Sequence, residues 1–257
     1  MINQLKINKM NIFNFKTMRK FAFTMLMFLT LSLKAQFKEV VRFMGIPVDG
    51  PKSEMISKLE NKGFIYKGDD DFLNGRFNGE DVNVFVHTNN GIVDRIMVVS
   101  ANPINESNIK IKFNTLVRQF ENNDKYMSSE ENQYIGDDVD ISYEMLVNKK
   151  RFQASFHQCY TKEEIDVIKP YINDNYEILI EAFKQSFSDY MEYMEQEGVA
   201  FGDDREENVN GLMMLFSLYY AINNDVWFMI SESDRYNYFN INIFYDNLSN
   251  RPNGEDL

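Results

Sequence analysis

The stretch FMGIPVDGPKSEMISKLENKGF, residues 43–64, is the one around which the rest of the chain is organised. It begins with a short apolar strand, residues 43–46, and a proline-containing turn. Apolar residues three and four positions apart then predict an amphipathic helix over residues 51–62. Pro51 suits the first helical position, because no backbone donor is needed there.

Both ends of this helix carry local signals. Asp49 or Gly50 can cap its start. After the last turn, Gly63 can adopt the left-handed conformation, and Phe64 follows where a hydrophobic contact with Leu59 is expected. We therefore predict a Schellman motif at the C-terminal end.

An antiparallel meander is predicted next, from strands at Phe72–Phe77, Val82–His87 and Ile92–Ser100. Asn78-Gly79 and Asn90-Gly91 join these strands, and both dipeptides favour two-residue hairpin turns with positive φ. Alternating valines in the middle strand predict one buried face and one wet face. Asn74-Gly75 is a third such dipeptide, which predicts either a bulge or a shifted first hairpin.

A second amphipathic helix is predicted from about Asn105. Its apolar residues are Ile109, Phe113, Leu116, Val117 and Phe120. A shift of 61 residues aligns the first helix with this one. A hairpin with strands at 141–147 and 152–160 is predicted to follow, around Asn148-Lys149-Lys150. We interpret the whole as a tandem repeat of a helix followed by a small antiparallel sheet.

From Thr161 the pattern becomes helical. Pro170 is expected to break a first short piece and Asp174 to cap a longer helix. The apolar stripe of that helix, which indicates either core packing or a face for a partner, is Tyr176, Leu179, Ile180, Phe183, Phe187, Tyr190, Met191 and Met194. The last predicted elements are a helix marked by Val209, Leu212, Met213, Phe216 and Tyr220, a hairpin at 226–231 and 239–245, and a polar tail from Asn247. With Trp227 and Phe228 side by side, the first strand of this hairpin is expected to be central or covered on both faces.

The predicted fold class is α+β, with tandem helix-plus-antiparallel-sheet units, an added long C-terminal helix and a final β-hairpin. The expected parts are a signal peptide at 1–36, a first α/β unit at 37–101, a second at 102–160, and a helical segment with the hairpin at 161–257. No low-complexity linker separates these parts, so we expect them to pack together.

The N-terminus has the features of a secretory signal. Met18-Arg19-Lys20 is a basic start, with Met18 a possible true start codon, and Phe21 to Leu33 is an apolar run of 13 residues. A bilayer requires about 20. We therefore favour a signal cleaved near Lys34-Ala35-Gln36 over a retained anchor, with no stable membrane insertion afterwards and a periplasmic or secreted location.

Charge and cysteine content argue against several functions and modifications. Loss of residues 1–36 removes six basic and no acidic residues, leaving 21 basic and 39 acidic residues and a formal charge of −18. Such a surface argues against nucleic-acid or membrane-surface binding. Cys159 is the single cysteine, so the chain forms no internal disulfide and has no cysteine for lipid attachment after the apolar run.

Ser155, His157 and Cys159 form the best candidate for chemistry, because they share the more polar face of one predicted strand. A cysteine beside a histidine is the starting point of a thiol nucleophile. Residues two apart on a strand have Cα atoms roughly 6.5–7 Å apart, so the side chains must still converge to about 3 Å. We favour a solvent-facing strand with an incidental thiol and keep the catalytic pair as the alternative.

Three acidic groups contain the oxygen ligands that calcium prefers: Asp69-Asp70-Asp71, Asp137-Asp138-Asp140, and Asp203-Asp204 with Glu206-Glu207. None matches the twelve-residue calcium loop, so solvated turns are the favoured interpretation and no metal is assigned. No glycine-rich phosphate loop, nucleophile elbow, HExxH or paired CxxC occurs, and no cofactor is expected.

Two motifs carry a resemblance: FMGIPVDG, residues 43–50, leading into Ser53-Glu54-Met55, and the ending from FYDN, residues 244–247, to GEDL, residues 254–257. On these, the chain resembles a family of exported proteins from gut bacteria that carries no assigned activity. The likeness covers most of the mature chain and implies no catalytic or binding residue. The architecture also looks like that of the β-lactamase inhibitor protein and of small lipoproteins of outer-membrane assembly. The chain departs from the lipoproteins because it lacks their anchor cysteine.

These observations favour an exported protein of the cell envelope that binds another protein or a small ligand without catalysis. The alternative is an envelope hydrolase that uses Cys159 and His157. A third hypothesis is a periplasmic scaffold or stability factor.

Overall fold

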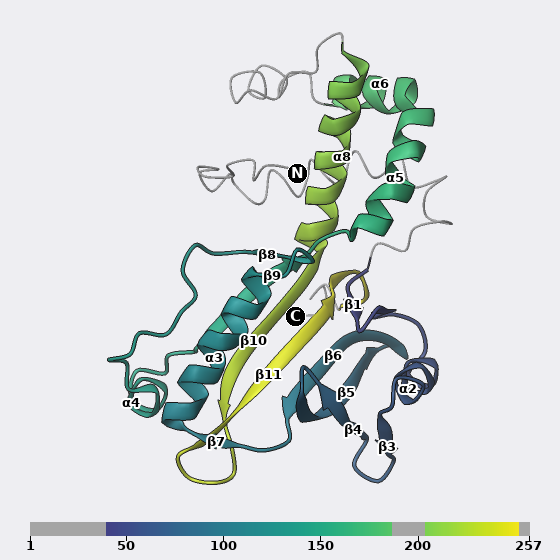
Figure 1. Cartoon of the computed structure of the whole chain (residues 1–257). Coiled ribbons are helices and arrows are strands. Elements are labelled where there is room, and N and C mark those ends of the chain that lie inside the picture. The colour runs from purple at the N-terminus through teal and green to yellow at the C-terminus, as the bar shows by residue number, and fades with distance from the viewer. Residues whose placement is uncertain (1–39, 187–203, 252–257) are drawn as a thin grey trace. The chain divides into compact units, whose positions relative to one another are not determined.

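The computed structural model describes residues 40–186 and 204–251 (Figure 1). The chain divides into two compact units. We call Glu39–Thr161 with Tyr220–Leu257 the sheet unit, and Lys162–Tyr219 the helical unit. Helices and a mostly antiparallel sheet are both present, so the predicted α+β class is confirmed.

The opening stretch forms a small hairpin before the helix. Strands β1 (Arg42–Phe43) and β2 (Ile46–Pro47) pair antiparallel, so the single strand predicted at 43–46 is wrong. The turn between them uses Met44 and Gly45 at φ angles of 51° and 80°. Glycine adopts this conformation at little cost, which allows the chain to reverse within two residues.

Helix α2 (Lys52–Glu60) begins one residue later than predicted, because Pro51 is itself the extended N-cap residue and no side chain caps the helix. The Asp49 carboxylate instead accepts from its neighbour's backbone N–H at 2.6 Å and from the Asn250 amide at 3.0 Å. The Schellman ending is confirmed. Gly63 has φ 95°, and the Phe64 N–H donates to the Leu59 carbonyl at 3.2 Å.

One antiparallel sheet contains the remaining strands, in the order β3-β4-β5-β6-β11-β10-β9-β8. Their bounds are β3 (Ile65–Lys67), β4 (Phe72–Phe77), β5 (Glu80–Asn89), β6 (Ile92–Ser100), β8 (Tyr126–Ser128), β9 (Gln153–Gln158), β10 (Asn224–Glu232) and β11 (Tyr238–Asn247). The short β7 (Ile104–Asn105) also pairs with β11. Both predicted hairpin turns are confirmed, with Asn78, Gly79, Asn90 and Gly91 all at positive φ.

The sheet consists of two matching halves. Helix α2 precedes β3–β6, and helix α3 (Glu106–Glu121) precedes β8–β11. The last strands of the two halves, β6 and β11, pair antiparallel at the centre of the sheet. In each half, the strands therefore follow in chain order from the edge to the centre. The second unit was predicted to end at residue 160. Its sheet instead includes β10 and β11, because the helical unit interrupts this half between β9 and β10. The hairpin at 224–247 completes the second half of the sheet.

The strand predicted at 141–147 is wrong, since Ile141–Leu146 forms helix α4. Its start is stabilised from two directions. The Asp140 side chain accepts from the Tyr143 N–H at 2.7 Å, and Glu106 of α3 accepts from the Ile141 N–H at 2.7 Å. Strand β9 therefore pairs on this side with β8, which precedes α4 in the chain, and on its other side with β10.

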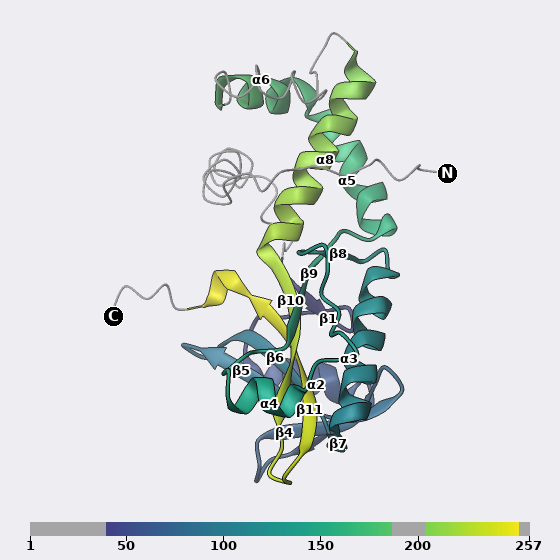
Figure 2. The ribbon, with the colours of Figure 1, turned by 90° about the vertical axis from the view of Figure 1, so that its left-hand side faces the viewer.

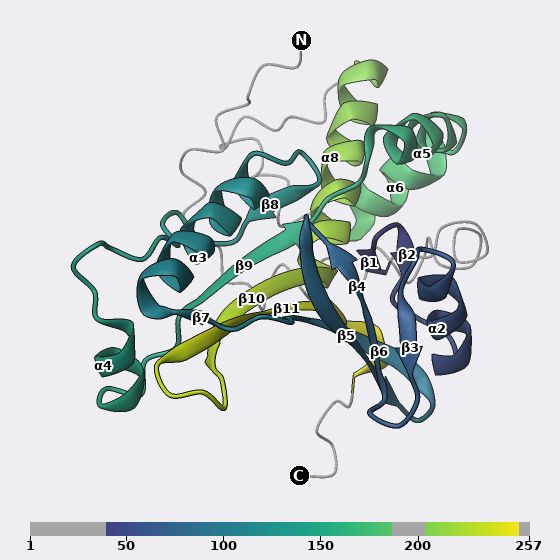
Figure 3. The ribbon, with the colours of Figure 1, turned by 60° about the horizontal axis from the view of Figure 1, so that its bottom comes forward.

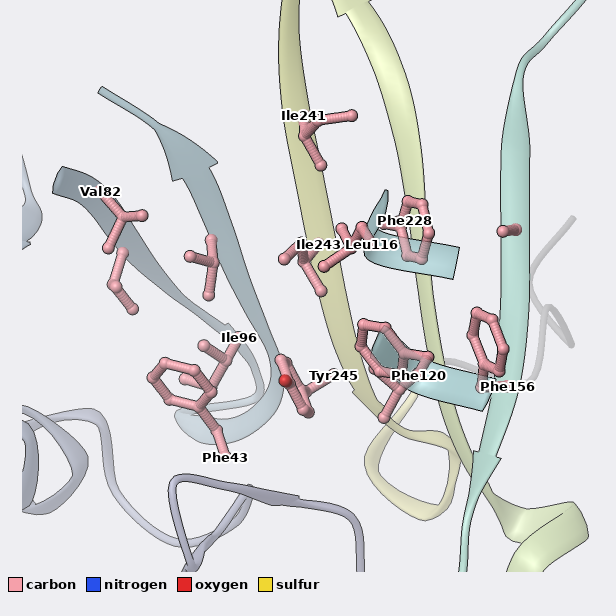
Figure 4. Packing of buried hydrophobic residues seen from close by; sticks show 14 of the residues in the cluster. Phe43, Val82, Ile96, Leu116, Phe120, Phe156, Phe228, Ile241, Ile243 and Tyr245 are labelled. Carbon is pink, nitrogen blue, oxygen red and sulfur yellow. The ribbon is translucent and has the colours of Figure 1, made fainter. Parts of the chain in front are cut away.

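Helices α2 and α3 contribute to one continuous apolar core on a single face of the sheet. Figures 1 and 2 show α3 alongside β10 and β11. In Figure 4, the ring of Phe120 from α3 lies beside those of Phe156 and Phe228, with centroid distances of 4.7 and 5.6 Å. All five apolar residues predicted for this helix are buried.

Gly75 lies in a regular register opposite Val82, so the bulge or shift predicted at Asn74-Gly75 is wrong. A Cβ atom at Gly75 would stand 2.5 Å from the Phe64 ring, so this glycine allows the ring to approach the strand. The irregularity of the sheet lies between His87 and Thr88.

Three helices make up the described part of the helical unit: α5 (Lys162–Asp174), α6 (Tyr176–Ser186) and the first part of α8 (Arg205–Asn223). The break predicted at Pro170 is wrong, because α5 continues through it and ends at Asp174, which is therefore no cap. Asn175 separates α5 from α6, and its side-chain amide donates to the Tyr171 carbonyl at 2.9 Å. The stripe residues Tyr176, Leu179 and Ile180 are buried, while residues 187–194 lie outside the described residues.

Within the described ranges, no helix combines the length and the apolar content that a bilayer crossing requires.

Candidate functional site

The candidate binding site lies on the face of the sheet opposite to α2 and α3. Strand alternation sends every other side chain of β4, β5, β6, β11, β10 and β9 away from α2 and α3. Most of these side chains are half-buried in the described structure, and Phe244 and Asp246 are buried. We call this surface the open face, and its residues form three rows that run across the strands.

The middle row is aromatic. In strand order from β4 to β9, it consists of Phe72, Phe85, Met97, Phe244, Trp227 and Ser155. The Trp227 and Phe244 rings are stacked 4.0 Å apart, and the Phe72 and Phe85 rings lie 5.6 Å apart. Aromatic and methionine side chains on neighbouring strands stabilise one another and present a large contact area.

An ionic row runs beside it and consists of His87, Arg95, Asp246, Asp225 and His157. Asp246 is its centre. The carboxylate accepts from Arg95 Nε at 2.6 Å and from Trp227 Nε1 at 2.7 Å, and Arg251 Nη2 lies 2.5 Å away. With its side chain only 2% exposed, Asp246 is a buried charge compensated by two guanidinium groups and an indole N–H.

Arg95 links the two rows. Its guanidinium carbon lies 5.0 Å from the Phe244 ring centroid and 5.7 Å from that of Trp227, within the range of a cation–π contact. The same group is fixed by Asp246, so the indole, the phenyl ring and the guanidinium form one rigid cluster.

The third row is mainly of amides: Asn74, Asn83, Val99, Asn242, Met229 and Gln153. The Asn74 amide donates to Asn83 Oδ1 at 3.2 Å. Asn242 Oδ1 is covered and has no hydrogen-bond partner among the described residues, so an acceptor is left unused there. The open face therefore offers aromatic, charged and amide groups in parallel.

Ser155 and His157 share the open face of β9, as predicted, but the hydrogen bonds of the three residues singled out in the sequence go to different partners. The Ser155 hydroxyl is paired with that of Ser129, and Nδ1 of His157 lies 2.8 Å from Oδ1 of Asp225. Cys159 follows the end of β9, and its thiol donates to the His157 backbone carbonyl at 3.7 Å. In the described structure no hydrogen bond joins the thiol to the imidazole.

The Cys159 thiol is expected to react more slowly with a maleimide than the cysteine of an unstructured peptide at pH 8. Burial raises the pKa of this thiol, so the folded protein contains less thiolate at pH 8 than an unstructured peptide. The comparison of second-order labelling rates checks this, with the urea-unfolded protein as the matched control. A folded-state rate above that of the peptide would instead indicate an activated thiol and support the hydrolase alternative.

One residue of each acidic group has a structural role. Asp71 is paired with Lys52 at 2.6 Å and accepts from the Tyr66 hydroxyl at 2.8 Å, and these hydrogen bonds lower the pKa of its carboxyl. Asp140 caps α4, and Asp204 accepts from two N–H groups in the first turn of α8. The described residues contain no group of three His, Cys, Asp or Glu side chains arranged to hold a metal ion.

Sequence reasoning missed two glutamines that replace strand pairing with side-chain hydrogen bonds. Gln133 accepts from the Ser155 N–H at 2.6 Å and donates to the Ser155 carbonyl at 3.0 Å. Gln158 makes the same pair of bonds with Arg42, at 2.7 and 2.9 Å. No sequence pattern marks these residues. Asp246, by contrast, lies in the FYDN motif and could have been noticed as an acid within an apolar strand.

Fold and site together define an α+β protein whose two-half antiparallel sheet presents an aromatic and ionic face. Comparison with known proteins adds no closer identification: no family model, no curated protein and no solved structure matches the chain.

Proposed function

We propose that this is an exported, non-catalytic binding protein of the cell envelope, and that it binds another protein through the open face. The observation that carries the proposal is the aromatic row, in which Phe85, Met97 and Trp227 stay half-exposed beside a fixed arginine. Aromatic residues, methionine and arginine are enriched at the centres of protein interfaces. The signal-like N-terminus supports the envelope location.

Rigidity supports the same proposal. The Asp246 cluster holds Arg95 and Trp227 in place before any partner arrives. A preorganised surface loses less side-chain entropy on binding, so more of the contact energy remains as affinity. His157 contacts Asp225, and the Cys159 thiol contacts a backbone carbonyl. These contacts do not support a hydrolase.

The size of the open face indicates how a partner would use it. Six strands at a spacing of about 4.8 Å make a row roughly 24 Å wide, and three rows extend about 14 Å along the strands. The resulting area of roughly 300 Å² is smaller than the ~800 Å² that each partner of a standard interface buries. The rows would thus form the centre of the interface, with the partner extending over neighbouring surface.

Replacement of Phe85 and Met97 by serine is expected to reduce partner capture from envelope extract at least tenfold. Both side chains are half-exposed on the open face, so the change removes contact area without opening the core. Quantitative pull-down against the unchanged protein measures the effect. Ile111→Ser is the control, because Ile111 is 64% exposed on α3, which lies on the other side of the sheet. Absence of any protein whose capture depends on the open face would contradict the proposal.

A further inference from the structure

Helix α4 exposes an apolar surface at one end of the sheet unit, where Figure 3 shows it beyond α3. Tyr143, Leu146 and Val147 are 54%, 66% and 53% exposed, whereas Ile141 on the same helix is fully buried. Single exposed apolar residues are ordinary, but three within five positions form a patch.

Three consecutive cations begin three residues after the end of the helix: Lys149, Lys150 and Arg151, all exposed. No ion pair joins any of them to an acidic group in the described ranges. Lys149 Nζ donates to the Leu146 carbonyl at 2.8 Å, and Lys150 Nζ lies 5.1 Å from the Phe152 ring centroid. In a chain with a formal charge of −12, this cluster is a local exception.

The patch is held firmly on α3. Glu106 accepts from the Ile141 N–H, and Lys110 Nζ donates to the Val139 carbonyl at 2.6 Å. The Lys150 N–H donates to the Glu144 carbonyl at 3.0 Å, which folds the basic segment back against the helix. The apolar and cationic groups therefore share one fixed geometry.

We infer that Tyr143, Leu146 and Val147, together with Lys149, Lys150 and Arg151, form a docking surface for an anionic membrane. Apolar side chains on a short helix can enter the boundary between headgroups and acyl chains while adjacent cations contact lipid phosphates. Each cation near such a surface strengthens binding roughly fivefold. The inference does not depend on the proposed role of the open face.

The negative charge of the rest of the chain does not oppose this contact, although four acidic residues of the same segment, Asp137, Asp138, Asp140 and Glu144, reduce the local attraction. At physiological ionic strength, charges more than about 8 Å from the membrane surface are largely screened, so the groups at the contact determine the sign of the interaction. Net charge, which argues against membrane-surface binding, is a sum and does not describe where the cations lie. An acidic protein could also contact the cations, and the experiment separates this case.

Flotation of the exported protein with vesicles tests the inference. At low salt, we expect the protein to float with vesicles of phosphatidylethanolamine and phosphatidylglycerol but not with phosphatidylcholine vesicles, and to be released as salt is added. Lys149→Gln, Lys150→Gln and Arg151→Gln together are expected to weaken partitioning about 100-fold. Leu146→Ser with Val147→Ser is expected to weaken it at least tenfold.

The matched control removes the same charge elsewhere, through Lys62→Gln after α2, Lys67→Gln on β3 and Arg76→Gln on β4, all exposed positions. This variant is expected to float like the unchanged protein. The inference is overturned if both triple variants lose the same partitioning, if neutral vesicles bind equally well, or if the unchanged protein binds soluble polyglutamate and not the anionic vesicles.

Discussion

Phe228→Ala is expected to lower the free energy of unfolding by about 4 kcal/mol, within the range typical of truncating a fully buried phenylalanine. Its ring is inaccessible to solvent and lies 5.0 Å from that of Phe113 and 5.6 Å from that of Phe120, both on α3. Truncation would leave a cavity where the helix meets β10, and the surrounding rings can fill it only in part. Urea unfolding at neutral pH measures the change.

Phe85→Ala is the matched control, since it removes the same atoms from the open face. Phe85 is half-exposed, and the expected loss is no more than about 1.5 kcal/mol. If the two substitutions cost the same, the open face would behave as a buried layer, and the binding surface proposed there would have to be abandoned.

Asp246→Ala is expected to destabilise the protein by about 3 kcal/mol, because it leaves charged and polar donors without their acceptor. The side chains of Arg95 and Arg251 are each 31% exposed, so water can compensate only part of the loss. The Trp227 indole N–H loses its acceptor in the same change. Denaturant unfolding gives the magnitude, and intrinsic fluorescence should report an altered environment of the single tryptophan.

Asp225→Ala provides the comparison, as it changes the neighbouring carboxylate of the same row. Asp225 is 36% exposed and is paired with one imidazole, so we expect a loss below about 1 kcal/mol. A double-mutant cycle of Asp246→Ala with Arg95→Ala should show a coupling of at least 1 kcal/mol. Additive effects of these two substitutions would mean that the ion pair does not organise the open face.

Elements coded by neighbouring residues could be predicted. The spacing of Ile109, Phe113 and Leu116 sufficed for α3, and the asparagine–glycine dipeptides sufficed for two hairpin turns. Gly63 and Phe64 sufficed for the end of α2. Each depends on a helical period or a positive φ angle, and both are properties of a few consecutive residues.

Local reasoning failed where a distant group decided the conformation. Residues 141–146 have a pattern compatible with a strand, but Asp140 caps a helix there and the carboxylate of Glu106, 35 positions earlier than Ile141, accepts from its first N–H group. The prediction of a hairpin partner for β9 was also wrong, because β8 pairs with that edge of β9 and the Gln133 side chain bonds to Ser155 beside it.

The candidate site was predicted only in its parts. The strand that carries Ser155 and His157 was recognised, and so was the alternation in β11, but the ionic row was not. Arg95 and Asp246 meet although 151 positions separate them. No periodicity within either strand specifies which strand will lie beside it.

By itself, then, the sequence determined most of the elements: two amphipathic helices, the C-terminal end of the first, the tight turns and the strands that alternate between apolar and polar residues. Tertiary structure alone decided that β6 pairs with β11, that the helical unit interrupts the second half of the sheet, and that Arg95, Trp227 and Asp246 share one face. The physical reason is range. Backbone dihedral preferences act over a few residues, whereas strand pairing is selected by the burial of a whole apolar face against α2 and α3.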